Sequence, residues 1–345
     1  MSNRRSFRPS PCEALEERVV LSPTVALSIH AANHHHGPNP NAPVPFVGPV
    51  GTLGDSYTDE YQFYPPDRSA ARNWVEVLHA LRGVSFGHYT TASRGEPRNQ
   101  GFADNWARSD ADSNDMVHNQ LPGLTAQVAA GQVKVAWIFI GGDDYLHLLN
   151  KVRAGTIAPA DAPAAIIQTT AQLEVNFLTA VKTLLAANPN VKLVVSTLPP
   201  ISDVPLARLA AQSNPLAQAL LAGVDQGVAS YNNLIKATAG GSSRIALVDL
   251  DAVTKQTAAS PTGTIEFGGQ TINLLTPSDD YHSFFLADQI HIGTVAQGIV
   301  ADQFALAVNQ KFGARLVPPS PVEIVHYAAA IQRHASHLGA VHPKY

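Results

Sequence analysis

Short apolar runs alternate with longer amphipathic stretches along most of the chain. The runs have the length of β-strands and cover residues 46–53, 133–140, 191–198 and 245–250. Apolar residues recur at helical spacing over residues 70–81, 164–187, 217–237 and 294–312. Strands separated by helices of this length pair in parallel, because a parallel crossover needs a dozen or more residues.

The second run, VKVAWIFI, is apolar almost without interruption. Such a strand is typical of a sheet that helices cover on both faces. We therefore expect an α/β fold, a three-layer α/β/α sandwich around a mainly parallel central sheet.

The two ends of the chain lack this alternation. Residues 1–44 are interpreted as an N-terminal export-type segment and linker, since RPSPCEALEERVVLS resembles a segment found on exported bacterial proteins. This predicts an extracytoplasmic or secreted protein. Residues 45–313 form the α/β domain, and residues 314–345 form a C-terminal tail with room for one extra helix.

Composition excludes several classes of function. The 23 Lys and Arg residues nearly balance the 27 Asp and Glu residues, and no basic stripe indicates nucleic-acid binding. No apolar run reaches the length needed to cross a bilayer, so we expect no transmembrane segment. Cys12 is the only cysteine, which rules out an intrachain disulfide and a cysteine-based zinc site.

Polar residues follow the predicted strands, at the sheet edge where reactive groups collect in parallel α/β folds. Ser56 comes directly after the first strand, and a serine hydroxyl needs an adjacent base to act as a nucleophile. His291 is the candidate base. Asp288, three residues earlier, is placed to bind one imidazole nitrogen and leave the other for Ser56.

Four segments occur in the order and at the spacing of a known family: GDSYTDEY at 54–61, NWARSDADS at 105–113, IFIGGDDYL at 138–146 and DQIHIGTVAQGIVA at 288–301. They resemble the four conserved blocks of the SGNH/GDSL hydrolases over residues 46–312. The resemblance implies the flavodoxin-like fold of that family. It also implies a serine esterase that hydrolyses an acyl ester, an acetylated glycan or a lipid through an acyl-enzyme on Ser56. Asp288 and His291 complete the triad, and no metal or organic cofactor is needed.

The sequence departs from the family at the oxyanion hole. The resemblance implies three donors: the N–H of Ser56, a Gly N–H and an Asn amide, and here Asp110 and Asp143 occupy the Gly and Asn positions. Asp110 keeps its N–H, and Asp tolerates left-handed backbone better than most residues. An ionised Asp143 donates nothing, and losing one oxyanion donor costs about 3–4 kcal/mol.

Protonation would restore the Asp143 donor. It costs about 4 kcal/mol at pH 7 for an Asp of normal pKa. Burial beside Asp144 would raise that pKa, so we expect activity to rise below pH 6 if neutral Asp143 is the donor. Other candidate donors are Asn99, Asn105 and Asn114.

Further interpretations remain open. A catalytically impaired relative would use the same crevice to bind a ligand. Asp110, Asp112 and Asn114 match the start of a calcium loop, although Asp115 and Leu121 replace its Gly and Glu.

Two structural expectations remain. Residues 201–241 are either a lid over the substrate or a packing helix of the outer layer. Asp59 and Glu60 are expected in the first turn of a helix, where the helix dipole favours acidic side chains.

Overall fold

A parallel sheet forms the centre of the fold in the computed structural model, which describes residues 48–60, 71–90, 101–258 and 260–339. These residues belong to one compact unit that spans His34–Tyr345. Within them the sheet has four strands in the order β1-β4-β5-β6, all parallel. The strands are β1 Val50–Gly54, β4 Val135–Phe139, β5 Lys192–Ser196 and β6 Ile245–Val248.

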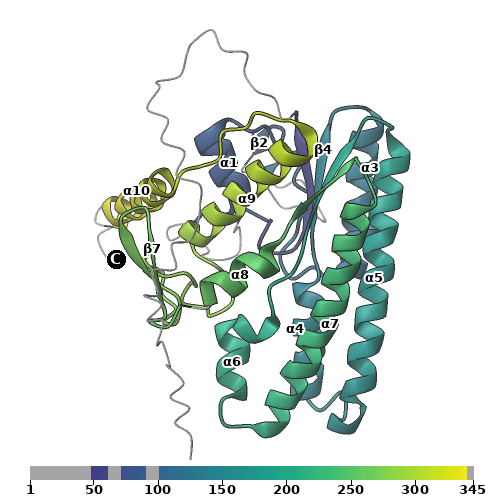
Figure 1. Ribbon diagram of the computed structural model, residues 1–345, viewed down its shortest axis with the longest axis vertical. Coiled ribbons are helices and arrows are strands. Elements are labelled where there is room, and N and C mark those ends of the chain that lie inside the picture. Colours follow the sequence, from purple (N-terminus) through teal and green to yellow (C-terminus); the bar gives the residue numbers. More distant parts are fainter. Residues whose placement is uncertain (1–47, 61–70, 91–100, 259, 340–345) are drawn as a thin grey trace, which may run out of the picture. The chain divides into compact units, whose positions relative to one another are not determined.

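Helices cover both faces of the sheet (Figure 1). One face carries α3 Leu121–Ala129, α5 Ala162–Ala187 and α7 Pro215–Gly240, with α4 Gly142–Arg153 beside them, and the other carries α1 Trp74–Arg82 and α9 Thr294–Phe312. The expected three-layer α/β/α sandwich is confirmed. No helix in the described part of the chain combines the length and apolarity needed to cross a membrane.

Further elements complete the described part of the fold. They are β2 Tyr89–Thr90, β3 Gly101–Phe102, α2 Ser113–Asp115, the π-helix η1 Met116–Gln120, the 3-10 helices η2 Pro159–Asp161 and η3 Ile201–Asp203, α6 Pro205–Ala211, α8 Leu250–Ala258, β7 Thr264–Phe267, β8 Gln270–Asn273 and α10 Pro321–Gly339. The sequence pattern predicts neither the β2–β3 ribbon nor the β7–β8 hairpin, because strands of two to four residues are too short to show a period.

An aromatic stack in the core joins the sheet to the α1–α9 layer. The ring of Trp137 lies 3.9 Å from that of Trp74 and 4.9 Å from that of Phe304, between centroids. All three side chains are fully buried. The stack fixes α1 and α9 against β4, beside the strand that precedes Ser56.

Helix α1 begins later than the pattern predicts. Asn73 caps it and forms a reciprocal capping box with Glu76. The expectation that Asp59 and Glu60 start a helix is wrong, since residues 56–60 form turns. Their carboxylates instead accept hydrogen bonds from the backbone N–H groups of Ser109, at 2.8 Å, and Phe102, at 2.9 Å.

Candidate active site

The turn that carries Ser56 is anchored at its base. Gly54, the last residue of β1, donates its N–H to Oε1 of Gln120 at 3.0 Å and accepts from Nε2 of the same side chain at 2.9 Å. Gln120 is fully buried and ends the π-helix η1. π-helical turns are frequent at functional sites, but the sequence offers no periodic signal for one, and Gln120 was not predicted.

Asp288 and His291 lie in one loop that their own hydrogen bonds hold together. Oδ2 of Asp288 contacts Nδ1 of His291, and its Oδ1 accepts from the N–H groups of Ile290 and His291, both at 3.0 Å. Burial opposes ionisation of Asp288, but these hydrogen bonds outweigh it and lower the pKa of the carboxyl group. The Asp288 contact assigns the proton to Nδ1, so Nε2 of His291 is the basic nitrogen.

Tyr57 supports this loop and was not predicted. Its hydroxyl donates to the Ile290 carbonyl at 2.6 Å, and its ring centroid lies 5.9 Å from that of His291. The loop also contains Gln289 at a φ of 68°, a conformation that non-glycine residues rarely adopt. Its carbonyl accepts from the Leu206 N–H at the start of α6, at 3.1 Å.

A cavity of about 640 Å³ brings the sequence-predicted residues together. Ser56, Asp110, Asp143 and His291 all line it, and Asp288 reaches it through His291. Asp110 has a φ of 65°, the left-handed geometry that glycine adopts most readily. Asp adopts this conformation more readily than most other non-glycine residues, which is compatible with the Gly position that the resemblance implies.

His147 is a further cavity residue that was not predicted. It lies one helical turn after Asp143 on α4, a spacing that the sequence already contains. Its Nε2 lies 2.9 Å from Oδ1 of Asp110. Burial acts against protonation, but the surrounding carboxylates of Asp110, Asp143 and Asp112 raise the pKa of His147.

Three carboxyl groups have strongly raised pKa values: those of Asp55 and Asp144 are buried, and that of Asp143 is half-buried. Burial is the main cause for each, raising the pKa of Asp143 to about 8, of Asp55 to about 7 and of Asp144 to about 6. Asp55 is the neighbour that adds to the shift of Asp143, rather than Asp144 as the sequence predicted. Asp144 is instead hydrogen bonded to the N–H and hydroxyl of Ser113, at 2.9 and 2.6 Å.

Two residues of the candidate calcium loop have hydrogen-bond partners within the protein. Asp112 caps α2 by accepting from the N–H groups of Asn114 and Asp115, both at 2.9 Å, and Oδ1 of Asn114 accepts from Asn176 at 3.0 Å. Among the described residues, the group with the spacing of a metal site is Asp110, Asp143 and His147, whose ligand atoms all lie within 4.8 Å of one another.

Two of the alternative oxyanion donors, Asn105 and Asn114, lie in the described residues, and neither lines the cavity. Nδ2 of Asn105 donates to the Thr58 carbonyl at 2.7 Å. Asn99 lies outside the described residues. Among the candidate side-chain donors in the described residues, Asp143 is therefore the one that lines the cavity.

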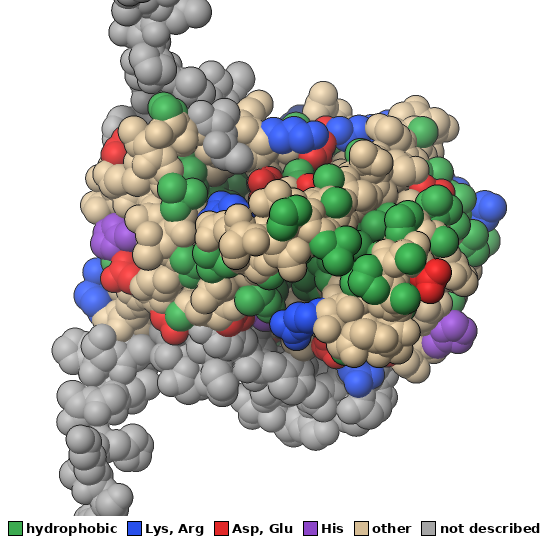
Figure 2. All heavy atoms as spheres, turned by 90° about the horizontal axis from the view of Figure 1, so that it is seen from below, with side chains coloured by type: hydrophobic (Ala, Val, Ile, Leu, Met, Phe, Trp, Pro, Cys, Tyr) green, Lys and Arg blue, Asp and Glu red, His purple; other side chains and the backbone are tan. Residues whose placement is uncertain are grey.

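The segment 201–241 contributes to the outer layer and to the wall of the cavity, and its role as a lid stays a prediction. The C-terminal part of α7 packs on the sheet through Val228, Tyr231 and Ile235. Helix α6 and the start of α7 line the 640 Å³ cavity. Figure 2 shows hydrophobic side chains gathered on the face that includes these helix ends, where Leu206 and Leu216 are 41% and 54% exposed.

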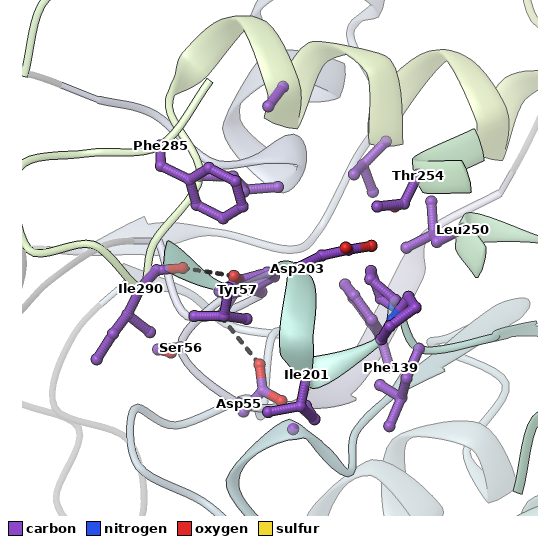
Figure 3. A pocket seen from close by; sticks show the side chains of 18 of the residues that line it. Asp55, Ser56, Tyr57, Phe139, Ile201, Asp203, Leu250, Thr254, Phe285 and Ile290 are labelled. Atoms are coloured by element: carbon purple, nitrogen blue, oxygen red, sulfur yellow. Dashed lines mark hydrogen bonds between the residues drawn. The ribbon is translucent and has the colours of Figure 1, made fainter. Parts of the chain in front are cut away.

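A second, smaller cavity of about 100 Å³ also opens at Ser56 (Figure 3). It shares Ser56, Asp143, Leu146 and Ile290 with the larger cavity. Its remaining lining is mostly apolar and comes from the carboxyl ends of β4, β5 and β6, from α8 and from α9. Ser56 therefore lies at the junction of a wide cavity and a narrow apolar one.

Comparison with known proteins matches residues 50–304 to the family GDSL-like Lipase/Acylhydrolase. A lipase from a goat rumen metagenome is 13% identical, with a TM-score of 0.46 over 78% of this chain and 100% of the lipase. A phospholipase A1 from Streptomyces albidoflavus is 16% identical, with a TM-score of 0.46 over 76% and 99%. A family 3 carbohydrate esterase from Clostridium thermocellum is 13% identical, with a TM-score of 0.37 over 76% and 94%. No curated protein matches the sequence.

Proposed function

We propose that this chain, which belongs to the GDSL-like lipase/acylhydrolase family, is a serine esterase that works through an acyl-enzyme on Ser56. Family membership supports ester hydrolysis as the general reaction. The observation that carries the catalytic assignment is the pairing of Asp288 with Nδ1 of His291, on the wall of the same cavity as Ser56.

In the first half-reaction Nε2 of His291 removes the proton from Ser56, whose oxygen attacks the carbonyl carbon of the ester. Asp288 stabilises the imidazolium that forms. The carbon–oxygen bond to the alcohol then breaks, and His291 returns the proton to the leaving oxygen. Water repeats the sequence on the acyl-enzyme, which releases the carboxylic acid and restores Ser56. No step of this scheme calls on a metal or an organic cofactor.

The oxyanion donors in this scheme are the backbone N–H groups of Ser56 and Asp110 and the neutral carboxyl group of Asp143. A buried carboxylic acid that stays protonated at neutral pH is an established kind of oxyanion donor. The raised pKa of Asp143 supports this role, because the group is mainly neutral at pH 7. It also favours an active enzyme over an impaired relative that only binds ligand, since that alternative depends on an ionised Asp143.

Labelling with a fluorescent fluorophosphonate tests the assignment. The wild-type protein should be labelled, Ser56→Ala should not be, and Asp288→Asn should be labelled at least about 100-fold more slowly, because the His291 tautomer is no longer fixed. A Ser109→Ala variant on the same cavity wall is the matched control. Labelling of Ser56→Ala at the wild-type rate would refute the nucleophile. Activity removed by a chelator and restored by Zn²⁺ would instead assign Asp110, Asp143 and His147 to a metal.

A further inference from the structure

We infer that the narrow apolar cavity holds the acyl chain of the ester and the wide cavity its alcohol, and that the preferred acyl group is short, about the size of butanoyl. This rests on the proposed serine esterase function. It goes beyond that function by fixing the orientation of the substrate and by choosing among acetyl, short and long acyl groups.

The lining of the narrow cavity matches a hydrocarbon chain. Figure 3 shows the cavity extending from Ser56 towards Leu250, past Ile201 and Phe139. These positions follow the strand ends from β1 to β6. Most of such a lining gains free energy from burying methylene groups, and its apolar side chains cannot replace the hydrogen bonds that a sugar hydroxyl makes with water.

The proton route fixes the orientation. His291 lines the wide cavity and is not part of the lining of the narrow one. His291 must return its proton to the leaving oxygen, so that oxygen lies on the wide side. The carbonyl carbon bonds to Ser56 at the junction, and the acyl chain therefore extends into the narrow cavity. The wide cavity carries Asn150, Arg153 and Asn214 beside the leucines of α6 and α7, so it offers an alcohol both polar and apolar contacts.

The size of the cavity sets the chain length. A cavity of about 150 Å³ lined by Leu, Ile and Phe holds benzene, a ring of six carbon atoms. In proportion, a cavity of about 100 Å³ holds about four carbon atoms. Acetyl would leave most of the space empty, and a long chain would extend beyond it.

Carboxyl groups in the lining narrow the choice further. Asp203 faces the cavity in Figure 3, and burial and the nearby Asp225 raise its pKa. Asp55 also lines the cavity, next to Ser56. A neutral acyl chain is compatible with these groups, whereas an acyl chain ending in a carboxylate, such as succinyl, is repelled as they ionise.

The test is the kcat/KM of wild-type enzyme on p-nitrophenyl esters from acetate to palmitate. Each buried methylene contributes about 0.8 kcal/mol, so butanoate should exceed acetate by about 15-fold through its two extra methylenes. Decanoate and palmitate should be no better than butanoate. An optimum at acetate, or a rise that continues to palmitate, would overturn the inference while labelling of Ser56 leaves the esterase assignment intact.

Substitutions in the cavity walls test the acyl and alcohol assignments separately. Val253→Phe on α8 fills the narrow cavity and should bring butanoate and acetate to near parity, whereas Gln256→Phe, exposed on the same helix, should keep the wild-type ratio. Phe285→Ala enlarges the narrow cavity and should move the optimum to longer acyl chains.

Leu206→Trp in the wide cavity should alter the preference among alcohols and leave the acyl optimum unchanged. An unchanged acyl profile in both Val253→Phe and Phe285→Ala would refute the acyl assignment.

A binding measurement keeps the inference independent of turnover. Ser56→Ala retains both cavities, so the methyl NMR signal of butanoate should broaden in its presence at pH 5. Adding Val253→Phe should abolish the broadening, and adding Gln256→Phe should not. Butanoate binding that survives Val253→Phe would place the acyl chain elsewhere, whether or not Ser56 is the nucleophile.

Discussion

Asp110 and Asp143, the two aspartates proposed as oxyanion residues, show how single residues are accommodated in this site. Asp110 adopts the left-handed backbone that glycine would supply, and its carboxylate pairs with His147. Asp143 is kept neutral by burial and by Asp55 nearby. The raised pKa removes most of the cost of protonation, so the neutral donor is available near pH 8 and not only below the pH 6 expected from the sequence.

The pH dependence of catalysis tests the Asp143 donor. Asp143 is protonated below its pKa of about 8 and loses its donor hydrogen as the pH rises through that value. The wild-type kcat/KM should therefore fall above pH 8, by about 100- to 1000-fold once Asp143 is fully ionised, which is the effect of losing one oxyanion donor. Asp143→Asn, whose amide donates at every pH, should keep its rate between pH 7 and 9.5. An equal fall in both proteins would show that Asp143 is not the titrating donor.

At the scale of elements, two helices position the residues around Ser56. The π-helix η1 delivers Gln120 to both backbone groups of Gly54, and α4 begins directly after β4. The N-terminus of α4 brings Asp143 to the site together with the positive end of the helix dipole, which stabilises negative charge on an oxyanion. These elements fix the Ser56 turn relative to its oxyanion donors.

Replacing Gln120 tests this anchoring. Gln120→Leu removes both hydrogen bonds to Gly54, so the buried N–H of Gly54 loses the Gln120 side chain as its acceptor. This loss should lower the free energy of unfolding by about 2–3 kcal/mol. The turn should also loosen, so kcat should fall more than KM rises. Urea unfolding and steady-state kinetics measure the two effects. Gln127→Leu on α3 removes hydrogen bonds outside the cavity and should cost stability without lowering kcat. Equal losses of kcat in the two variants would contradict a positioning role for Gln120.

At the scale of the molecule, the sheet gathers groups from across the chain at one edge. The strand ends bring Asp55 and Asp143 together with Ser56, and the layers on both sides remove Asp55 from water and partly desolvate Asp143. Burial of acidic groups makes the site chemically distinctive and costs stability once they ionise.

The stability of the folded domain should therefore fall with rising pH. Asp143 and Asp55 keep their protons to about pH 8 and 7 in the folded state, while an unfolded Asp releases its proton near pH 4. Between these values the native state binds more protons, so the free energy of unfolding decreases by up to about 1.4 kcal/mol per pH unit for each group.

We expect Tm to be higher at pH 5 than at pH 8, and the difference to shrink in Asp143→Asn. Groups with a lowered pKa, such as Glu323 at about 2, change the stability only below pH 5 and do not affect the comparison between pH 5 and pH 8. Thermal unfolding followed by circular dichroism measures this difference in Tm. A Tm that is equal at both pH values, or higher at pH 8, would mean that these carboxyl groups are already ionised in the folded state.

The sequence by itself determined the sandwich and the polar residues that end its strands. The β1, β4, β5 and β6 runs are apolar enough to be recognised alone, and Asp288 and His291 are only three residues apart, so local pattern predicts their pairing. It was wrong about Asp59 and Glu60, whose partners Ser109 and Phe102 are distant in the chain.

Only the tertiary structure decided what surrounds those residues. Tyr57 meets Ile290 across 233 positions and Gln120 meets Gly54 across 66, and no periodicity records such contacts. The pKa of Asp143 and the two cavities at Ser56 likewise depend on which side chains exclude water. Secondary structure follows from the spacing of apolar residues along the chain, whereas desolvation and cavity shape arise when separate segments pack together.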